Sequence, residues 1–423
     1  MYFTSKQLAV YIFMIYFCFL FVFQTIIPYY VGAAAVMAAI PVLAYERMSI
    51  TIRAYVFPIL LLYAIMLLWS TEPHKSFVYF FILIEALVFI RPDEKDMRLA
   101  LDVIKRAAIV YAIFVFVTKI FPNLMCGYAE LVFFDRATVD GYIRAIQKGY
   151  CPGINHQIGY TALYIVLGMF AYVYDYEITK KKKYSRVIFL FMALLLTNKR
   201  SALLFFVIIL LMIYFFNATP KQKLNRFIKL LIAFVGSVVL LIVVANLFPS
   251  VPIFNRFLSL FTMIKDGTGD ANKVLSGRLA IYRNVLELYD THKWFGIGWE
   301  NFSDFSRARS ASGKPNQGHN VFLQLLAEVG IVGFIPVILI NLYYLGICFK
   351  RNRFIIKYLP VNQKRTFVYG TCRCCSMAFM IFYYLFWFSG NALYDIPLLY
   401  TWLVSIWLCV SINKQHIVQS SNL

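Results

Sequence analysis

The segment Gly318-His319-Asn320-Val321-Phe322-Leu323-Gln324-Leu325-Leu326-Ala327-Glu328-Val329-Gly330-Ile331-Val332-Gly333 decides the fold class of this chain. At its start a polar loop with a titratable imidazole changes into an apolar run that continues to residue 349. An apolar run of this length crosses a bilayer as a helix, because only a helix satisfies its own backbone hydrogen bonds in hydrocarbon. The segment therefore predicts a membrane helix that begins at a polar face, with His319 at the boundary.

The composition extends this prediction to the whole chain. Of its 423 residues, 61% are hydrophobic, and the mean hydropathy is +0.70. Soluble domains are usually below half apolar. We therefore expect an all-α polytopic membrane protein with about twelve transmembrane helices, each of about 17–25 residues. The expected spans lie near 8–27, 29–45, 52–69, 76–91, 107–122, 158–174, 187–198, 201–216, 228–248, 321–349, 371–388 and 394–412.

Charge predicts the orientation of these spans. The short basic segments 91–106, 180–186, 221–229 and 350–365 fall on one side of the membrane if the N-terminus is inside. The positive-inside rule then places both termini in the cytoplasm. It places two long loops, 123–157 and 249–320, and the turn Asn198-Lys199-Arg200 outside. We expect residues 1–423 to form a single integral membrane domain, with the large outer loop 249–320 carrying part of an active site.

The net charge of +21 has two possible meanings. In a soluble protein it would favour nucleic-acid binding, but here Lys and Arg gather in the predicted cytoplasmic loops, so no nucleic-acid partner is expected. Cations on the outer face do not serve topology and remain available to bind an anion. They are Arg144, Lys148, Lys199, Arg200, Arg278, Arg283, Arg307, Arg309 and Lys314.

Two of these positions lie at predicted helix starts. Arg200 opens a span in Thr197-Asn198-Lys199-Arg200-Ser201-Ala202-Leu203, where a cation extending to the membrane surface is the alternative interpretation. Arg278 follows Ser276, a plausible N-cap, at the start of an amphipathic helix. There its guanidinium and the free backbone N–H groups could hold one phosphate, although a solvated surface arginine is equally consistent with the pattern.

His319 follows Asn316-Gln317-Gly318. A neutral imidazole at such a position is suited to take a proton from a hydroxyl, and a histidine hydrogen-bonded to its own loop is the alternative. His156, in Gly153-Ile154-Asn155-His156-Gln157-Ile158-Gly159, lies at the mouth of another predicted span and is a candidate for the same site.

Several other kinds of site are not indicated. The cluster Cys372-Arg373-Cys374-Cys375 lacks a histidine or a second cysteine pair at zinc spacing. The sequence contains neither a phosphate-binding Gly-x-x-x-x-Gly-Lys-Ser/Thr loop nor a Gly-x-Ser-x-Gly nucleophile turn. The sequence leaves open whether Cys126 and Cys151 pair across one outer loop.

Taken together, four segments resemble the O-antigen ligase and O-antigen polymerase superfamily of bacterial envelope glycosyltransferases. They are Arg144 to Gly159, with Pro152-Gly153-Ile154-Asn155 before a span; Thr197 to Leu203; Ser276 to Tyr282; and Gly318 to Gly333. The segment Trp294-Phe295-Gly296-Ile297-Gly298-Trp299-Glu300-Asn301-Phe302 is similar to the family's Gly-x-Gly-x-x-x-Phe element. The resemblance extends over residues 140–400.

The resemblance implies a substrate and residue roles. The donor would be an oligosaccharide on undecaprenyl pyrophosphate at the outer face of the bacterial plasma membrane, transferred to an acceptor hydroxyl without a nucleotide sugar. Arg200, Arg278 and Lys199 would bind the pyrophosphate, while His319 and Arg278 would act in catalysis. No metal or other cofactor is expected, because arginines would neutralise the leaving group. Further substrate contacts are expected from Arg144, Asn155, His156 and Asn320.

Within this superfamily the acceptor separates the activities. We favour a polymerase that joins lipid-linked repeat units into O-antigen, capsular polysaccharide or exopolysaccharide, because such polymerases serve many glycans in diverse bacteria. The alternatives are an O-antigen ligase that transfers the glycan to lipid A core, and a polysaccharide transporter or flippase, whose span number would be similar. Membrane lipids and a chain-length regulator protein are the other expected partners.

Overall fold

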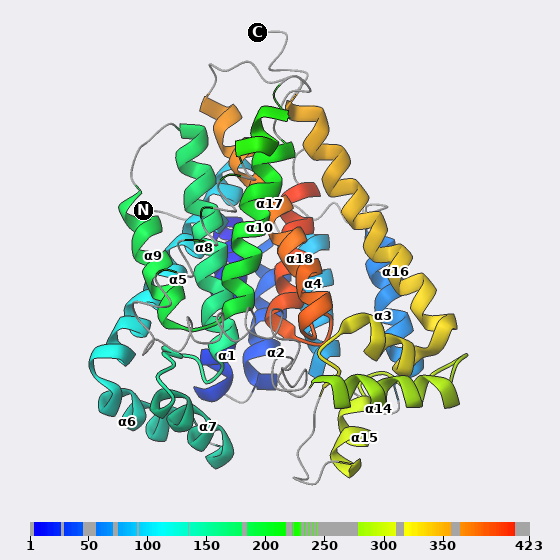
Figure 1. Cartoon of the computed structure of the whole chain (residues 1–423). Helices are drawn as coiled ribbons and strands as arrows, with labels where there is room; N and C mark the ends of the chain where they lie inside the picture. The colour runs from blue at the N-terminus through cyan, green and yellow to red at the C-terminus, as the bar shows by residue number, and fades with distance from the viewer. Residues whose placement is uncertain are drawn as a thin grey trace.

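A computed structural model describes residues 4–26, 29–44, 56–70, 75–90, 93–133, 135–179, 184–216, 278–309, 317–356 and 364–410, with residues 224–229 and isolated positions between 222 and 243. Every regular element in these ranges is a helix, which confirms the all-α fold class. The helices are α1 (Ser5–Ile26), α2 (Tyr29–Ala44), α3 (Phe57–Trp69), α4 (Lys75–Phe89), α5 (Glu94–Ile120), α6 (Pro122–Val132), α7 (Arg136–Gln147), α8 (Ile158–Thr179), α9 (Ser185–Leu196), α10 (Arg200–Phe216), α14 (Arg278–Thr291), α15 (Phe302–Arg309), α16 (Val321–Ile356), α17 (Lys364–Ser389) and α18 (Ile396–Val410) (Figure 1).

Small residues and paired aromatic rings hold the centre of the bundle together. A Cβ atom on Gly168 of α8 would lie 2.1 Å from the Cβ of Ala108 on α5, so these two helices approach too closely for any larger residue. Beside this contact, the rings of Tyr111 and Tyr164 stack with their centroids 5.1 Å apart. Both hydroxyls donate hydrogen bonds to carbonyl groups of α1. The three helices α1, α5 and α8 are therefore locked together by buried, satisfied polar groups.

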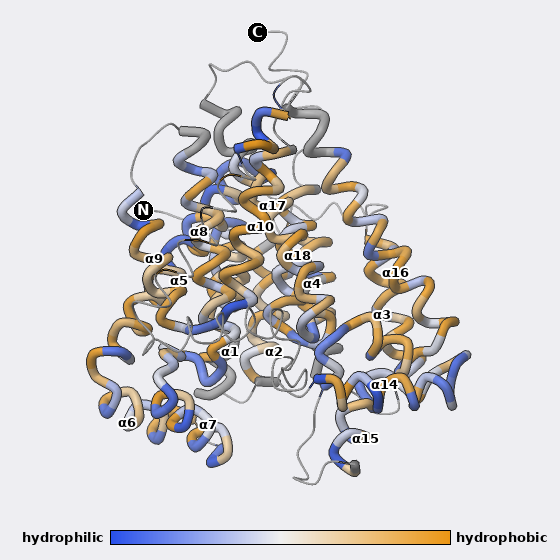
Figure 2. The backbone as a smooth tube through the Cα atoms, in the orientation of Figure 1, coloured by the Kyte–Doolittle hydropathy of each residue, from blue (hydrophilic) through white to orange (hydrophobic). Residues whose placement is uncertain are grey.

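The described helices support part of the predicted set of spans. Three segments are long and apolar enough to cross a membrane, namely Ile158–Tyr176, Val321–Lys350 and Thr371–Ser389, and several shorter apolar helices accompany them. Hydrophobic residues dominate along the bundle in Figure 2. A described helix covers every predicted span except 228–248, most of which lies outside the described residues. The chain is a helical membrane protein, while the full set of spans and their orientation stay predictions.

Four helices from the two predicted outer loops lie at one end of the bundle. Helices α6 and α7 come from the first of these loops, and α14 and α15 come from the second. Figure 1 shows all four at the lower end of the molecule, and Figure 2 shows hydrophilic positions along each of them. We call this end the site end of the bundle, because the candidate residues described below gather there.

A close backbone contact joins the second loop to α16. This helix is kinked at Gly330, where φ is +60°, and residues 293–299 pack against the kink. A Cβ on Gly296 would lie 2.3 Å from the backbone of Glu328, and a Cβ on Gly330 would lie 2.3 Å from the backbone of Trp294. Both positions therefore require glycine for close approach as well as for positive φ. The contact fixes the loop onto the helix that follows His319.

Candidate functional site

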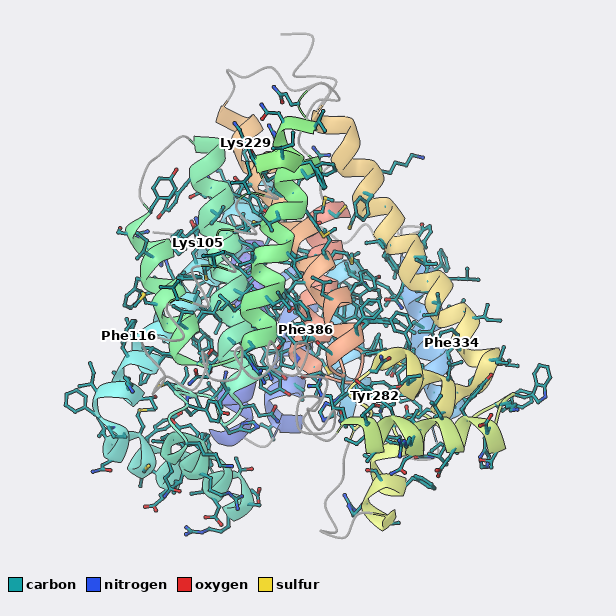
Figure 3. All side chains as sticks on the ribbon, viewed as in Figure 1. Lys105, Phe116, Lys229, Tyr282, Phe334 and Phe386 are labelled. Atoms are coloured by element: carbon teal, nitrogen blue, oxygen red, sulfur yellow. The ribbon has the colours of Figure 1, made fainter. Side chains whose placement is uncertain are left out.

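The backbone of His319 is held in an uncommon conformation by two distant elements. Its φ is +50°, in the left-handed region that few non-glycine residues occupy. Its N–H donates to the side-chain oxygen of Asn391 at 2.7 Å, and its carbonyl accepts from the hydroxyl of Tyr282 at 3.5 Å. Figure 3 labels Tyr282 on α14. A strained residue that the surrounding structure holds in place is a common feature of functional sites.

The residues on either side of His319 are fixed by the start of α16. The side chain of Asn320 accepts from the N–H of Leu323 at 3.1 Å and so acts as the N-cap of this helix. The N–H of Gly318 donates to the side-chain oxygen of Gln324 at 2.8 Å. Asn320 therefore has a structural role in the described residues, and its predicted substrate contact stays a prediction.

Glu328, which is fully buried, links this loop to the second outer segment. One of its oxygens accepts from the side-chain nitrogen of Gln324 at 2.9 Å and from the N–H of Phe302 at 3.2 Å. The other oxygen accepts from the N–H of Glu300 at 3.0 Å. A buried carboxylate needs such partners, since an unsatisfied one would cost several kcal/mol. Glu328 thus orders the wall behind His319.

Two cations lie close enough to His319 to change its protonation. Burial, the charge of Arg278 and the charge of Lys199, in that order, lower the pKa of His319 from its ordinary 6.5 to about 4. Burial also lowers the pKa of Lys199, and Arg278 lowers it further, while Asp395 opposes both effects. The structure therefore brings together three of the predicted site residues, from three separate segments of the sequence. At neutral pH their imidazole is uncharged and both cations flank it.

The turn between α9 and α10 positions Lys199. Asn198 adopts a φ of +56°, a conformation that asparagine tolerates better than most residues. The Thr197 hydroxyl accepts from the N–H of Lys199 at 3.3 Å. The Lys199 ammonium lies 3.5 Å from where a Cβ on Gly159 would be, so it packs directly on the backbone at the start of α8. The tight turn predicted from the sequence thus aims its lysine towards α8.

The remaining predicted residues occupy different surroundings. Arg200 is half-buried at the first position of α10, next to Lys199. Asn155 is 1% exposed and lies against Tyr111 in the core. Arg144 is exposed on α7, and no contact between described residues connects it to the cluster around His319. The predicted substrate contacts of Arg144 and Asn155 stay predictions.

His156 lies at the edge of the cluster. Its ring packs edge-on against Tyr160, with centroids 6.3 Å apart, and the Tyr160 hydroxyl hydrogen-bonds to Asp395. Burial lowers the pKa of His156, so this imidazole is also neutral at neutral pH.

Sequence reasoning missed several residues of this site. Asn391 and Asp395 lie in the turn between α17 and α18, which the sequence marks only with Ser389-Gly390-Asn391. Tyr282 and Glu328 lie inside the motifs quoted above, but the sequence alone indicates no role for them. A carboxylate at the end of an apolar span, such as Asp395, is the signal that would have pointed to this turn.

Apolar helices packed in a bundle, with cations and a neutral histidine gathered at one end, define the class, a helical membrane protein with a candidate site at that end of the bundle. Comparison with known families refines it, because residues 186–338 match the family model described as O-antigen ligase. The match contains Lys199, Arg200, Arg278 and His319, and it confirms the resemblance to the O-antigen polymerase and ligase superfamily. No curated protein matches the chain.

Proposed function

We propose that this protein polymerises oligosaccharide repeat units carried on undecaprenyl pyrophosphate, without a metal ion. The family match supports a membrane glycosyltransferase of the O-antigen ligase and polymerase type. The single observation that carries the proposal is the convergence of Arg278 and Lys199 on a neutral His319. Cations suit a pyrophosphate, and a neutral imidazole suits a hydroxyl that must lose its proton.

The reaction assigns one task to each group. The acceptor hydroxyl loses its proton to His319 as its oxygen forms a bond to the anomeric carbon of the donor sugar. The bond between that carbon and the pyrophosphate oxygen breaks, and undecaprenyl pyrophosphate leaves with the electron pair. Arg278, Lys199 and Arg200 stabilise the negative charge that develops on it, by charge-assisted hydrogen bonds.

Donor binding strengthens the base. In the ligand-free protein the charges of Arg278 and Lys199 help to lower the pKa of His319. A bound pyrophosphate brings negative charge beside both cations and offsets their effect on the imidazole. The pKa of His319 therefore rises when the donor arrives, so that the proton acceptor becomes effective only in the loaded site.

The orientation of the site follows from the positive-inside prediction. We place the site end at the outer face of the bacterial plasma membrane and both termini in the cytoplasm. There the lipid-borne pyrophosphate would meet Arg278 at the start of α14, where free backbone N–H groups and the guanidinium favour an anion. A chain-length regulator in the same membrane would be the natural protein partner of a polymerase.

The test uses the purified full-length chain in lipid nanodiscs with a lipid-linked repeat unit. We expect a ladder of glycans that grow by whole repeat units and remain attached to undecaprenyl pyrophosphate. A preparation that binds the donor but leaves it unextended, with no other acceptor present, would rule out polymerisation.

Ligation is the second candidate, and the description of the matching family favours it. The same preparation supplied with lipid A core separates the two activities. Transfer of glycan to the core without any ladder would assign the protein as a ligase. Movement of the lipid-linked unit across the bilayer with no new glycosidic bond would instead support the transporter alternative, which the family match does not favour.

A further inference from the structure

The turn between α17 and α18 touches the candidate site at three places, and it lies outside the region that matches the family model. Asn391 accepts from the N–H of His319. Tyr394 packs its ring on Trp299, the neighbour of Glu300, whose N–H donates to Glu328. At the third place, the Asp395 carboxylate accepts a hydrogen bond from Tyr160, the residue after Gly159, against which the Lys199 ammonium packs, and its charge acts on Lys199.

Asp395 is the last residue of this turn, immediately before α18 begins at Ile396. Its backbone N–H donates to the Asn391 carbonyl at 2.8 Å, so the main chain of Asp395 is tied to the residue whose side chain holds His319. Tyr160 donates a hydrogen bond to the carboxylate. The second carboxylate oxygen, Oδ1, is buried and has no hydrogen-bond partner in the described part of the chain. The carboxylate is therefore rigidly placed with unused capacity to interact with a cation.

We propose that Asp395 is a positioning residue that supplies the counter-charge for Lys199 at the pyrophosphate site. This inference rests on the proposed function, because it assumes that Lys199 binds the pyrophosphate. An arginine in the place of Lys199 would not need such a residue, since arginine stays protonated in proteins. A lysine in the same position needs a counter-ion, because burial and neighbouring cations favour its neutral form.

The charges around Lys199 determine whether loss of the Asp395 charge raises or lowers the pKa of Lys199. Arg278 at the start of α14 and Asp395 act on the charge of Lys199, and Lys199 acts on His319 before α16. Arg200 follows Lys199 in the sequence, and Tyr160 follows Gly159, against which the Lys199 ammonium packs. Burial and Arg278 lower the pKa of Lys199, and Asp395 is the group that raises it. Burial raises the pKa of Asp395 to about 6, so the carboxylate is ionised above neutral pH, where its support of Lys199 matters.

The test measures the affinity of the full-length protein for inorganic pyrophosphate between pH 7 and pH 10. Affinity should fall as pH rises through the pKa of Lys199. In Asp395→Asn the pH at which affinity falls to half should move down by roughly one unit or more, because the ionised partner of Lys199 is gone. At pH 7 affinity should be unchanged or higher, since a negative charge near the ligand has also been removed. Asp290→Asn, an exposed aspartate on α14, should keep the wild-type profile.

A second variant, Lys199→Arg, distinguishes a positioning role of Asp395 from a role in folding. In Lys199→Arg the cation stays charged over this range, so adding Asp395→Asn should leave the pH profile unchanged. A uniform loss of affinity at every pH, in either background, would indicate a structural role and overturn the inference. An unchanged midpoint in Asp395→Asn would overturn it as well, while leaving the donor site intact. No pyrophosphate binding by the wild-type protein would overturn the donor site and this inference together.

Discussion

The two ends of the bundle use the same kinds of charged residue in different ways. Away from the site end, Lys6 forms ion pairs with Asp93 and Asp96, and Lys105 pairs with Asp102 at 2.7 Å and Asp175 at 3.3 Å. At the site end, neither Lys199 nor Arg278 has an ion pair within the described residues, and a single carboxylate, Asp395, acts on Lys199.

This difference indicates that the ion-paired lysines stabilise the fold, whereas the cations at the site end bind a ligand. A paired cation at a helix end offsets its own desolvation and holds two elements together. Cations that cluster around an imidazole repel one another and lower its pKa, which costs stability. A bound anion that is not part of the chain would offset this repulsion between the cations. The following predictions test this distinction.

The largest effect is expected from His319→Ala. Loss of the proton acceptor should reduce polymer formed per folded molecule by about 10²–10⁴-fold, with donor binding retained. His292→Ala, an exposed histidine at the end of α14, provides the control and should keep wild-type output. Output near the wild-type level from His319→Ala would remove the histidine from the mechanism.

Arg278→Lys should have the next largest effect. Lysine keeps the charge but loses the planar fork that binds two phosphate oxygens, so turnover should fall roughly tenfold to a hundredfold. Arg283→Lys, on the same helix and exposed, is the matched control. Combining Arg278→Lys with His319→Ala should cost little more than His319→Ala alone, because both residues act on one transition state. Full additivity of the two losses would show that they act in separate steps.

Substituting methionine for Lys105 and for Lys199 should have different effects on the free energy of unfolding. Lys105→Met removes a cation from an ion pair whose acidic partners are partly exposed, so the free energy of unfolding should fall by roughly 1 kcal/mol with turnover per folded molecule unchanged. Lys199→Met removes a half-buried cation that Arg278 repels, so unfolding stability should hold or rise while pyrophosphate affinity falls. Chemical denaturation and pyrophosphate titration measure the two quantities, and a destabilised Lys199→Met would contradict the distinction.

The smallest effect is expected from Arg144→Ala. This side chain is exposed on α7, so its attraction for a charged substrate is weakened by solvent. We expect the KM for the donor to rise by about twofold to fivefold at low salt, with kcat unchanged, and the difference to vanish at high salt. A large fall in kcat would mean that α7 closes onto the site during the reaction.

The sequence alone determined the fold class and much of the candidate site. Apolar run length predicted the helices that form the bundle, because the hydrocarbon thickness and the helical rise are constants that any such segment must match. It did not predict α6, α7 and α15, which lie in the segments expected to be outer loops. Local motifs also identified His319, Arg278 and Lys199, because a cation or an imidazole at the polar end of an apolar helix is rare for energetic reasons. These inferences needed only neighbouring residues.

Only the tertiary structure decided which of these residues act together. Asp395 is 76 residues beyond His319 in the numbering, yet the turn that contains Asn391 and Asp395 holds the backbone of His319 and acts on the charge of Lys199. The same packing placed Asn155 in the core and left Arg144 exposed. No local pattern encodes such relations, because they depend on how the helices pack. The glycines at 168, 296 and 330 set that packing by letting backbones touch, and their effect on the site appears only when the partner segment is in place.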